Sequence, residues 1–331
     1  MNTTAIVFER PGEVALRDVA LPPPRPGQAQ VATHYSTISA GTEGWALQDR
    51  FTWQKTPFPC VPGYQRVGVI TALGDGVGGW EVGDRVAATM GTWDGNVGSQ
   101  WGAHAAAANT PASELYRLPE GVDAVDGSGL VVAQVGYNAA SRVTMRPGDW
   151  GLVYGDGLIG QCAAQAARAR GARVILVGRR PERLALAATH SADVAINARA
   201  EDVVATVRAH TAGGPAAFVL DTVQTEAAQR EYLPLLERGR GQIVYCGFTP
   251  SPAWADMALL QQQELTAHFV SGWARDRMEA TLTLMAAGKM CLRPLVTHLV
   301  PATRGPSAYR MIQEKTAPFL GVTLDWTEAR A

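Results

Sequence analysis

The hydrophobic pattern of the chain changes near residue 122. Residues 1 to about 122 carry short apolar segments of β type, such as 29–33 and 67–71, separated by turns rich in proline and glycine. From about residue 123 to 272, strand-like apolar runs alternate with helical segments. The pattern therefore predicts a β-rich, barrel-like domain followed by a doubly wound α/β domain with a parallel sheet.

Within the second region, four apolar runs have the length and composition of buried parallel strands. These runs are residues 150–154, 173–177, 218–221 and 242–246. The later pattern predicts helices near 275–287 and 307–314 and a closing strand at 321–326. Periodicity alone assigns this last stretch to neither domain.

The first of these strands leads into a G-x-G-x-x-G pattern, and a helix of small residues and then the second strand follow it. Gly155 allows the tight turn, Gly157 lets the backbone approach a pyrophosphate, and Gly160 lets the helix pack closely on the sheet. Leu158 and Ile159 complete the pattern at a helix N-terminus, which attracts the anion. We therefore predict a dinucleotide site of the nicotinamide type; a glycine-rich surface loop is the alternative.

The end of the second strand indicates which nicotinamide cofactor binds. NAD-binding units usually place an acidic residue here to hold the ribose hydroxyls, but this chain has Gly178 followed by Arg179 and Arg180. With no carboxylate to repel a phosphate and two guanidiniums to bind one, the sequence favours NADP(H). The alternative is that both arginines are ordinary solvated charges.

Composition fits an enzyme of this kind. The chain has 331 residues, of which 47% are hydrophobic, so it is long enough for two domains with sizeable cores. A formal net charge of -1 gives no basic excess, and we expect no nucleic-acid partner. The N-terminus does not resemble a signal peptide and no apolar run is long enough to span a bilayer, so we expect a cytoplasmic protein with no membrane partner. Its four cysteines are widely spaced in the sequence, and we expect them to be reduced thiols.

Short motifs occur along the chain in an order that resembles the medium-chain dehydrogenase/reductase superfamily over essentially the whole length. They are residues 24–27, 61–64, 82–86, 118–122, 146–149, 155–160 and 286–289. The resemblance implies a GroES-like catalytic domain at 1–124, to which 273–331 returns, and a Rossmann NADP-binding domain at 125–272. It also implies hydride transfer with a small-molecule substrate in a cleft between the domains. The assembly that it implies is a homodimer or homotetramer, of which we expect the homodimer.

Within the superfamily, the motif Ser39-Ala40-Gly41-Thr42-Glu43 resembles a branch that contains sugar and cyclitol dehydrogenases and bacteriochlorophyllide a dehydrogenases. Residues 243–248, 297–298 and 324–326 are similar to the last of these families. The resemblance favours chemistry between an alcohol and a ketone. It does not identify the substrate.

The sequence departs from zinc-dependent members of the superfamily at the positions of their metal ligands. Ala40 stands where they have cysteine, Tyr64 where they have histidine, and Val131 near their third ligand. Residues 87–122 contain no cysteine, so the structural zinc lobe, which needs four, is excluded as well. We therefore expect a member that uses no metal.

Without zinc, hydrogen-bond donors must stabilise the substrate oxygen. The resemblance makes Thr42 the first candidate, because it aligns with the residue that relays the alcohol proton in zinc enzymes. Tyr64 is a second donor to the same oxygen, with Gln65 as a neutral addition, and Glu43 is a candidate base or anchor for a substrate hydroxyl. For Tyr64 and Glu43 the alternative is a satisfied structural hydrogen bond. We expect His104 to be a packed, half-buried residue rather than a catalyst.

Four further residues are expected near the cofactor, because ligands of parallel sheets bind outside the carboxyl ends of the strands. The resemblance places them beside the adenosine and the nicotinamide, and they are Thr222, Cys246, Gly247 and Phe248. Asp221 lies at the same edge, and capping of the next helix is the alternative for it.

Three functions are compatible with these residues. The first is a zinc-independent, NADP(H)-dependent dehydrogenase or reductase that interconverts a secondary alcohol and a ketone on a small cyclic metabolite. The second is an NADPH-dependent reductase of activated C=C bonds, in which a few donors stabilise an enolate. The third is a protein that binds NADPH without catalysis.

Overall fold

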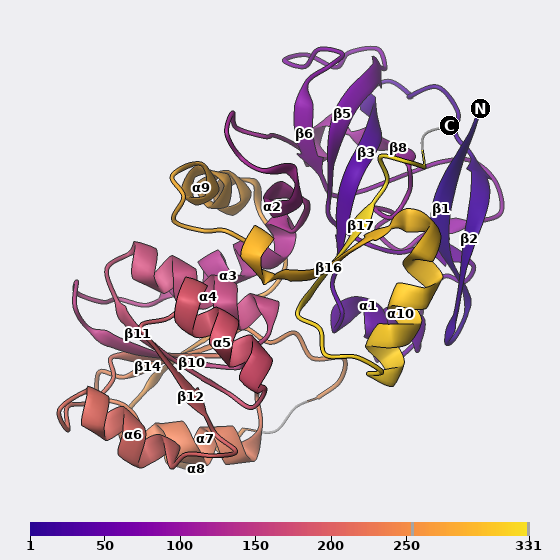
Figure 1. Ribbon diagram of the computed structural model, residues 1–331. Coiled ribbons are helices and arrows are strands. Elements are labelled where there is room, and N and C mark those ends of the chain that lie inside the picture. The colour runs from indigo at the N-terminus through magenta and orange to yellow at the C-terminus, as the bar shows by residue number, and fades with distance from the viewer. Residues whose placement is uncertain (253–254, 330–331) are drawn as a thin grey trace. The chain divides into compact units, whose positions relative to one another are not determined.

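The computed structural model describes residues 1–252 and 255–329, and the chain folds into two compact units. Unit 1 comprises Met1–Val131 and Val296–Ala331, and unit 2 comprises Val132–Leu295. The first and last parts of the chain thus share one unit, as the indigo and yellow segments of Figure 1 show.

Unit 1 is built mainly from strands. They are β1 (Asn2–Arg10), β2 (Glu13–Ala20), β3 (Gln28–Ile38), β4 (Cys60–Val61), β5 (Arg66–Leu73), β6 (Arg85–Ala88), β7 (Gly98–Ser99), β8 (Ala107–Pro111), β9 (Leu115–Arg117), β16 (Val296–Pro301) and β17 (Gly321–Asp325). Its helices are α1 (Thr42–Leu47), α2 (Ala124–Ser128) and α10 (Gly305–Glu314), with the 3-10 turns η1 (Ala112–Glu114) and η4 (Ala302–Arg304).

The strands of unit 1 form two sheets. The larger has the order β16-β17-β3-β5-β6-β9, with β8 also pairing with β3, and the smaller has the order β2-β1-β4-β7. The long strand β3 pairs with β5, β8 and β17, so it joins the N-terminal part of the unit to the C-terminal part. The predicted strands at 29–33 and 67–71 lie within β3 and β5 and are confirmed.

Trp326 is a large, fully buried side chain in the core of unit 1. It belongs to a cluster that includes Ile6, Phe8 and Tyr309, and the rings of Phe8 and Tyr309 meet edge to face at 5.2 Å. Nε1 of Trp326 donates to Oγ of Ser36 at 2.8 Å, so the buried indole N–H has the partner that it requires. The end of the chain therefore completes both the sheet and the core of this unit.

Unit 2 alternates strands and helices. The strands are β10 (Trp150–Tyr154), β11 (Arg173–Gly178), β12 (Val194–Asn197), β13 (Phe218–Asp221), β14 (Gln242–Tyr245) and β15 (Thr266–Phe269). The helices are α4 (Leu158–Ala169), α5 (Pro181–His190), α6 (Val203–His210), α7 (Glu226–Tyr232), α8 (Met257–Gln262) and α9 (Arg275–Ala286), with η2 (Leu233–Leu235) and η3 (Arg293–Leu295); α3 (Leu130–Arg142) begins at the boundary with unit 1.

The sheet of unit 2 is parallel throughout and has the order β12-β11-β10-β13-β14-β15. Helices α4 and α5 cover one face and α6 and α7 the other (Figure 1), which confirms the doubly wound α/β fold. The strand order reverses between β10 and β13, and ligands of such sheets bind at that reversal.

All four predicted strands of this region are present, but the sequence analysis named neither β12 nor β15. Both are only four residues long, and β12 is half-buried while β15 is mostly exposed at the sheet edge. Such strands lack the continuous apolar run by which buried parallel strands are recognised.

The unit boundaries differ from the predicted ones. The sequence analysis placed residues 273–331 with the first domain, whereas residues up to Leu295, including α9, belong to unit 2. Hydrogen bonds explain the difference: Nε of Arg277 in α9 donates to Oε1 of Gln134 in α3 at 2.9 Å, and Gln165 in α4 bonds both backbone groups of Cys291. Side-chain amides thus attach this segment to unit 2, which a hydrophobic pattern does not reveal.

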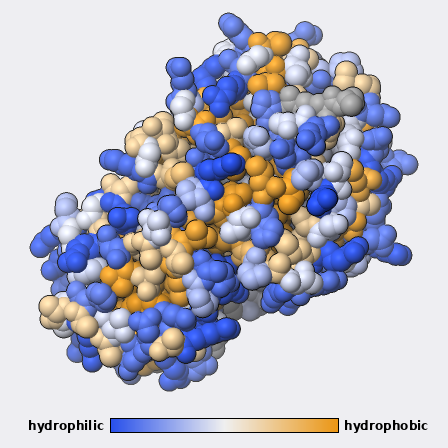
Figure 2. All heavy atoms as spheres, viewed as in Figure 1, coloured by the Kyte–Doolittle hydropathy of each residue, from blue (hydrophilic) through white to orange (hydrophobic). Residues whose placement is uncertain are grey.

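The surface of each unit is predominantly hydrophilic on the face shown in Figure 2, with smaller apolar areas between the polar side chains. Among the residues that the structure describes, no helix has the length and apolar character that a membrane span needs.

Replacing Trp326 with alanine should lower the free energy of unfolding by about 3–5 kcal/mol, because it leaves a cavity in a packed core. Trp53→Ala is the matched control, since the Trp53 side chain is 55% exposed and surface changes usually cost about 0.5 kcal/mol or less. Urea unfolding followed by circular dichroism measures both variants. Equal midpoints for the two would contradict this account of the core.

Candidate active site

The glycine pattern of unit 2 forms the turn between β10 and α4. Gly155 has φ 117°, which side chains rarely adopt, and its N–H donates to the carbonyl oxygen of Val177 in β11 at 2.9 Å. A Cβ at Gly160 would lie 2.0 Å from the carbonyl oxygen of Gly155, so the helix approaches the turn as closely as predicted. A Cβ at Gly157 would meet no atom within 4 Å, so this position faces open space. Leu158 and Ile159 open α4 directly after it.

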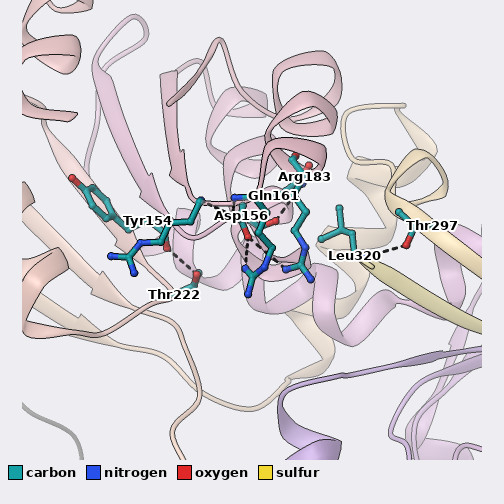
Figure 3. A network of polar contacts seen from close by, with 9 residues as sticks. Tyr154, Asp156, Gln161, Arg183, Thr222, Thr297 and Leu320 are labelled. Atoms are coloured by element: carbon teal, nitrogen blue, oxygen red, sulfur yellow. Dashed lines mark hydrogen bonds and ion pairs between the residues drawn. The ribbon is translucent and has the colours of Figure 1, made fainter. Parts of the chain in front are cut away.

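Asp156, between the first two glycines, is the centre of a polar network (Figure 3). Its side chain is almost fully buried, and Oδ2 accepts the backbone N–H groups of Arg179 and Arg180 at 2.8 and 3.0 Å. Oδ1 pairs with Nη1 of Arg180 at 3.0 Å and with Nη1 of Arg183 at 3.5 Å. The carboxylate therefore fixes the turn that follows β11 and holds two guanidiniums beside it.

Gly178 is explained by the same network. A Cβ at this position would lie 2.6 Å from Cβ of Asp156, so only glycine leaves room for the aspartate. The expectation that no carboxylate lies at this strand end is therefore wrong, because Asp156 supplies one from the glycine turn. Unlike a carboxylate at the strand end itself, it is already occupied by donors of the protein. One feature of the sequence could have indicated this carboxylate, namely an aspartate between two glycines together with three arginines that follow the next strand. The sequence analysis did not use it.

A cavity of about 260 Å³ opens at the ends of β10 and β11. It is lined by Gly155, Asp156, Gly178, Arg179 and Arg180, among others. Within residues 1–252 and 255–329, the Arg179 guanidinium makes no hydrogen bond or ion pair. The cavity thus brings together the first glycine of the pattern and the residues at the end of the second strand.

The remaining predicted cofactor residues gather at the ends of β13 and β14 and do not line this cavity. The Thr222 hydroxyl donates to the carbonyl oxygen of Tyr154 at 2.8 Å, and a Cβ at Gly247 would lie 2.7 Å from the carbonyl oxygen of Thr222. Cys246 is buried, and desolvation raises the pKa of its thiol. Phe248 is 38% exposed.

Asp221 is a structural residue at this edge. Oδ1 accepts the N–H groups of Val223 and Gln224 at 2.8 and 2.9 Å, and Oδ2 accepts the hydroxyl of Tyr232 at 3.0 Å. The side chain that caps α7 is Thr225, so Asp221 holds the turn before the helix rather than the helix itself.

In unit 1, three hydroxyl groups come together where β3 leads into α1. The Tyr64 phenol is hydrogen-bonded to the side chains of Ser39 and Thr42, and its ring meets Trp101 edge to face at 5.3 Å. Burial raises the pKa of Tyr64, and the charge of Glu43 raises it further, whereas the two hydrogen bonds act in the opposite direction. We call Ser39, Thr42 and Tyr64 the hydroxyl cluster. It contains two of the predicted catalytic residues, and Thr42 is partly exposed.

Glu43 lies beside the hydroxyl cluster but is fully buried. Oε1 accepts the N–H of Ser39 at 2.7 Å, while Oε2 accepts the hydroxyl of Tyr309 and pairs with Nε2 of His104 at 2.9 Å. Three donors of the protein therefore occupy this carboxylate. This is the alternative that the sequence analysis gave for Glu43, namely a structural hydrogen bond that the protein itself satisfies.

His104 is fully buried rather than half-buried as expected. Its Nδ1 is hydrogen-bonded to Oγ of Ser36 at 2.8 Å, and Ser36 also accepts the indole of Trp326. A Cβ at Gly63 would lie 2.5 Å from the His104 ring, so the residue before Tyr64 must be small. A series of hydrogen bonds therefore runs from Trp326 through Ser36 and His104 to Glu43. It connects the core of unit 1 to the residues that hold the hydroxyl cluster.

The residues of unit 1 do not fit a zinc ion. Ala40 and Val131 carry hydrocarbon side chains, and the phenol of Tyr64 is kept protonated by burial. Among the described residues, no three His, Cys, Asp or Glu side chains are grouped so that they could hold a metal ion.

Two family models match the chain. Residues 25–120 match the alcohol dehydrogenase GroES-like domain, and residues 159–287 match the family described as zinc-binding dehydrogenase. The first covers much of unit 1 and the second lies within unit 2.

Curated relatives resemble the chain over nearly its whole length. A "putative D-xylulose reductase" of Rhizobium meliloti strain 1021 is 28% identical and covers 92% of this chain and 94% of its own. The 2-desacetyl-2-hydroxyethyl bacteriochlorophyllide A dehydrogenase of Cereibacter sphaeroides is also 28% identical and covers 93% and 94%.

Solved structures share the fold. A "putative zinc-binding dehydrogenase" from Sinorhizobium meliloti 1021, bound to NADP, has a TM-score of 0.85 at 19% identity and covers 98% of this chain and 99% of its own. A short chain alcohol dehydrogenase from Escherichia coli CFT073, complexed with NADH, has a TM-score of 0.83 at 22% identity with the same coverage.

The family matches thus fall in both units, and the curated relatives match nearly the whole chain. The chain therefore belongs to the medium-chain dehydrogenase/reductase superfamily of oxidoreductases.

Proposed function

We propose that this protein is a zinc-independent, NADP(H)-dependent oxidoreductase that interconverts a secondary alcohol and a ketone on a small, cyclic metabolite. The observation that carries the proposal is the hydroxyl cluster, in which Tyr64 occupies a position that the resemblance assigns to a metal ligand in zinc-dependent members. The relatives named as dehydrogenases and reductases support the alcohol chemistry.

The hydroxyl cluster suits a ketone oxygen. Because burial raises the pKa of Tyr64, the phenol stays protonated at neutral pH and acts as a hydrogen-bond donor rather than a base. Thr42 is partly exposed, so its hydroxyl can reach a substrate oxygen, donating to a ketone in reduction and accepting from an alcohol in oxidation. The nicotinamide cofactor, when bound, supplies or accepts the hydride.

Glu43 has a positioning role in this proposal. Its carboxylate holds the N–H of Ser39 and is itself held by His104 and Tyr309, so it fixes the start of α1. Ser39 and Thr42 flank that point and both bond the Tyr64 phenol. A buried carboxylate with three donors keeps these hydroxyls in one arrangement, which hydrogen-bond catalysis requires.

The preference for NADP(H) rests on the residues after β11. Asp156 is fully occupied by Arg180, Arg183 and two backbone N–H groups, so it does not compete for a ribose hydroxyl. The Arg179 guanidinium lines the same cavity without a protein partner in the described chain, and it fits the phosphate on the ribose of NADP. Glu231 from α7 also lines the cavity. Solved relatives carry NADH or NADP, so they support a nicotinamide cofactor of either kind.

A second candidate function is the reduction of an activated C=C bond. It is favoured by the neutral Tyr64 phenol, since a protonated donor without a metal also stabilises an enolate. The position at which hydride arrives on the product separates the two reactions.

Incubation with NADPH deuterated at the transferable hydrogen, together with cyclic ketones and enones, should place deuterium on a carbinol carbon. Mass spectrometry of the products locates the label. Deuterium β to a surviving carbonyl would make the protein an ene reductase, and absence of turnover with every compound would favour a protein that binds NADPH without catalysis.

Thr42→Val should lower kcat/KM for ketone reduction by about 10²-fold or more, because it removes a donor to the developing alkoxide. Thr283→Val is a matched control, since Thr283 is exposed on α9 and its hydroxyl bonds only its own helix. Steady-state kinetics with NADPH measures both variants. Full activity in Thr42→Val would remove this residue from the proposed mechanism.

Arg179→Met should raise the Kd of NADPH about tenfold and leave the Kd of NADH unchanged, because only NADPH carries the phosphate that a guanidinium would bind. Arg173→Met is the control, as Arg173 lies at the other end of β11 against Trp150. Quenching of protein fluorescence gives both constants. Parallel losses for the two cofactors would contradict the assignment.

A further inference from the structure

A second cavity lies in unit 1, beside the hydroxyl cluster along the chain. It has a volume of about 590 Å³ and is bounded by α1, the loop after α1 and the end of α10. Ala40, Gly41 and Gly44 line it on either side of Thr42 in the sequence. The cavity therefore adjoins the segment that carries the proposed catalytic threonine.

Amide and cationic side chains form the polar part of the lining of this cavity. They are Gln48, Arg50, Gln313 and Lys315, and none makes a side-chain hydrogen bond or ion pair within the described residues. Nε2 of Gln313 is buried without an acceptor, which is rare in a folded protein. No acidic residue lines the cavity, and the carboxylate of Asp49, next to Arg50, is occupied by Lys55 and by the N–H of Thr56.

Two glycines, Gly41 and Gly44, line this cavity. Gly44 lies inside α1, where glycine is the least favourable residue apart from proline. Neither packing nor backbone conformation requires it, because a Cβ there would meet no atom within 4 Å and its φ is not positive. Gly41 is also open, with only the Trp45 ring at 4.0 Å from a Cβ. The absent side chains keep space free in front of the backbone.

The lining also has an apolar part. Trp45 contributes its indole ring, which meets Phe51 edge to face at 6.4 Å, and Ile312 contributes a hydrocarbon side chain. A flat ring beside cations and amides suits a ligand with both a cyclic body and a charged group.

We propose that this cavity binds an anionic group, a carboxylate or phosphate, carried by the substrate. The proposal rests on the function proposed above and narrows the substrate to an anionic hydroxy or keto compound. Arg50 and Lys315 supply the positive charge, and the amides of Gln48 and Gln313 supply further donors. Two other roles would use the same cations. The diphosphate of the dinucleotide is also anionic, and both cations follow helix C-termini, where positive charge is favourable by itself. The experiment must therefore separate binding of a substrate anion from binding of the cofactor and from stabilisation of the helix ends.

The test compares 4-oxocyclohexanecarboxylate with its methyl ester as ketone substrates for the full-length protein with NADPH. The wild type should favour the acid by about tenfold in kcat/KM, as expected for one charged hydrogen bond. Arg50→Met and Lys315→Asn should each lower this ratio toward one; asparagine is chosen because Lys315 has φ 54°. Arg310→Met is the control, since Arg310 is exposed on α10 and does not line the cavity, and it should keep the ratio.

Three results would overturn the proposal. A wild-type ratio near one shows that no anionic group is recognised. An unchanged ratio together with a higher Kd for NADPH in Arg50→Met assigns the cations to the cofactor. An unchanged ratio with a lower melting temperature assigns them to the helix ends.

A binding measurement, which needs no turnover, distinguishes failure of the proposed function from failure of the proposed anion site. If neither ketone is reduced, calorimetric titration with inorganic phosphate still examines the cavity. Binding that is lost in Arg50→Met but kept in Arg310→Met supports an anion site, and absence of binding to the wild type rejects it.

Discussion

A carboxylate buried away from water must be matched by donors of the protein, and in each unit this requirement organises the candidate site. In unit 1, Glu43 accepts hydrogen bonds from Ser39, His104 and Tyr309. Through His104 and Ser36 it is also linked to the buried Trp326. In unit 2, Asp156 receives two backbone N–H groups and two guanidiniums. Both carboxylates act by holding the segments on which the proposed ligand contacts lie.

This arrangement is the basis of our proposal that the reaction needs no metal. Zinc fixes the position of the substrate oxygen by coordination, and hydroxyl groups can replace it only if they are held in place themselves. Tyr64 is constrained by burial, by the ring of Trp101 and by its bonds to Ser39 and Thr42. The buried network behind Glu43 fixes the other two hydroxyls, so a rigid set of neutral donors replaces the metal in our proposal.

The two proposed anion contacts follow a common rule. Arg180 and Arg183 are both paired with Asp156. Within the described residues, by contrast, the side chains of Arg179 in unit 2 and of Arg50 and Lys315 in unit 1 have no partners, and all three line cavities. The net charge of the chain is only -1. Unpaired cations at cavities are suited to a ligand that supplies the missing negative charge.

The sequence by itself determined the elements and contacts that are local in the chain. The strand at 150–154, the glycine turn after it and the helix that follows were predicted correctly, because turn geometry and apolar runs depend on neighbouring residues. The sequence also indicated that Ala40 and Val131 cannot bind zinc, since that depends on side-chain chemistry alone.

The tertiary structure decided the features that depend on contacts between residues far apart in the chain. Asp156 meets the turn at 179–180, Glu43 meets His104 and Tyr309, and the segment before Leu295 joins unit 2 through amide hydrogen bonds. Such pairs are far apart in the sequence and leave no periodic signal, so only the folded chain shows which carboxylates are occupied and which cations remain unpaired.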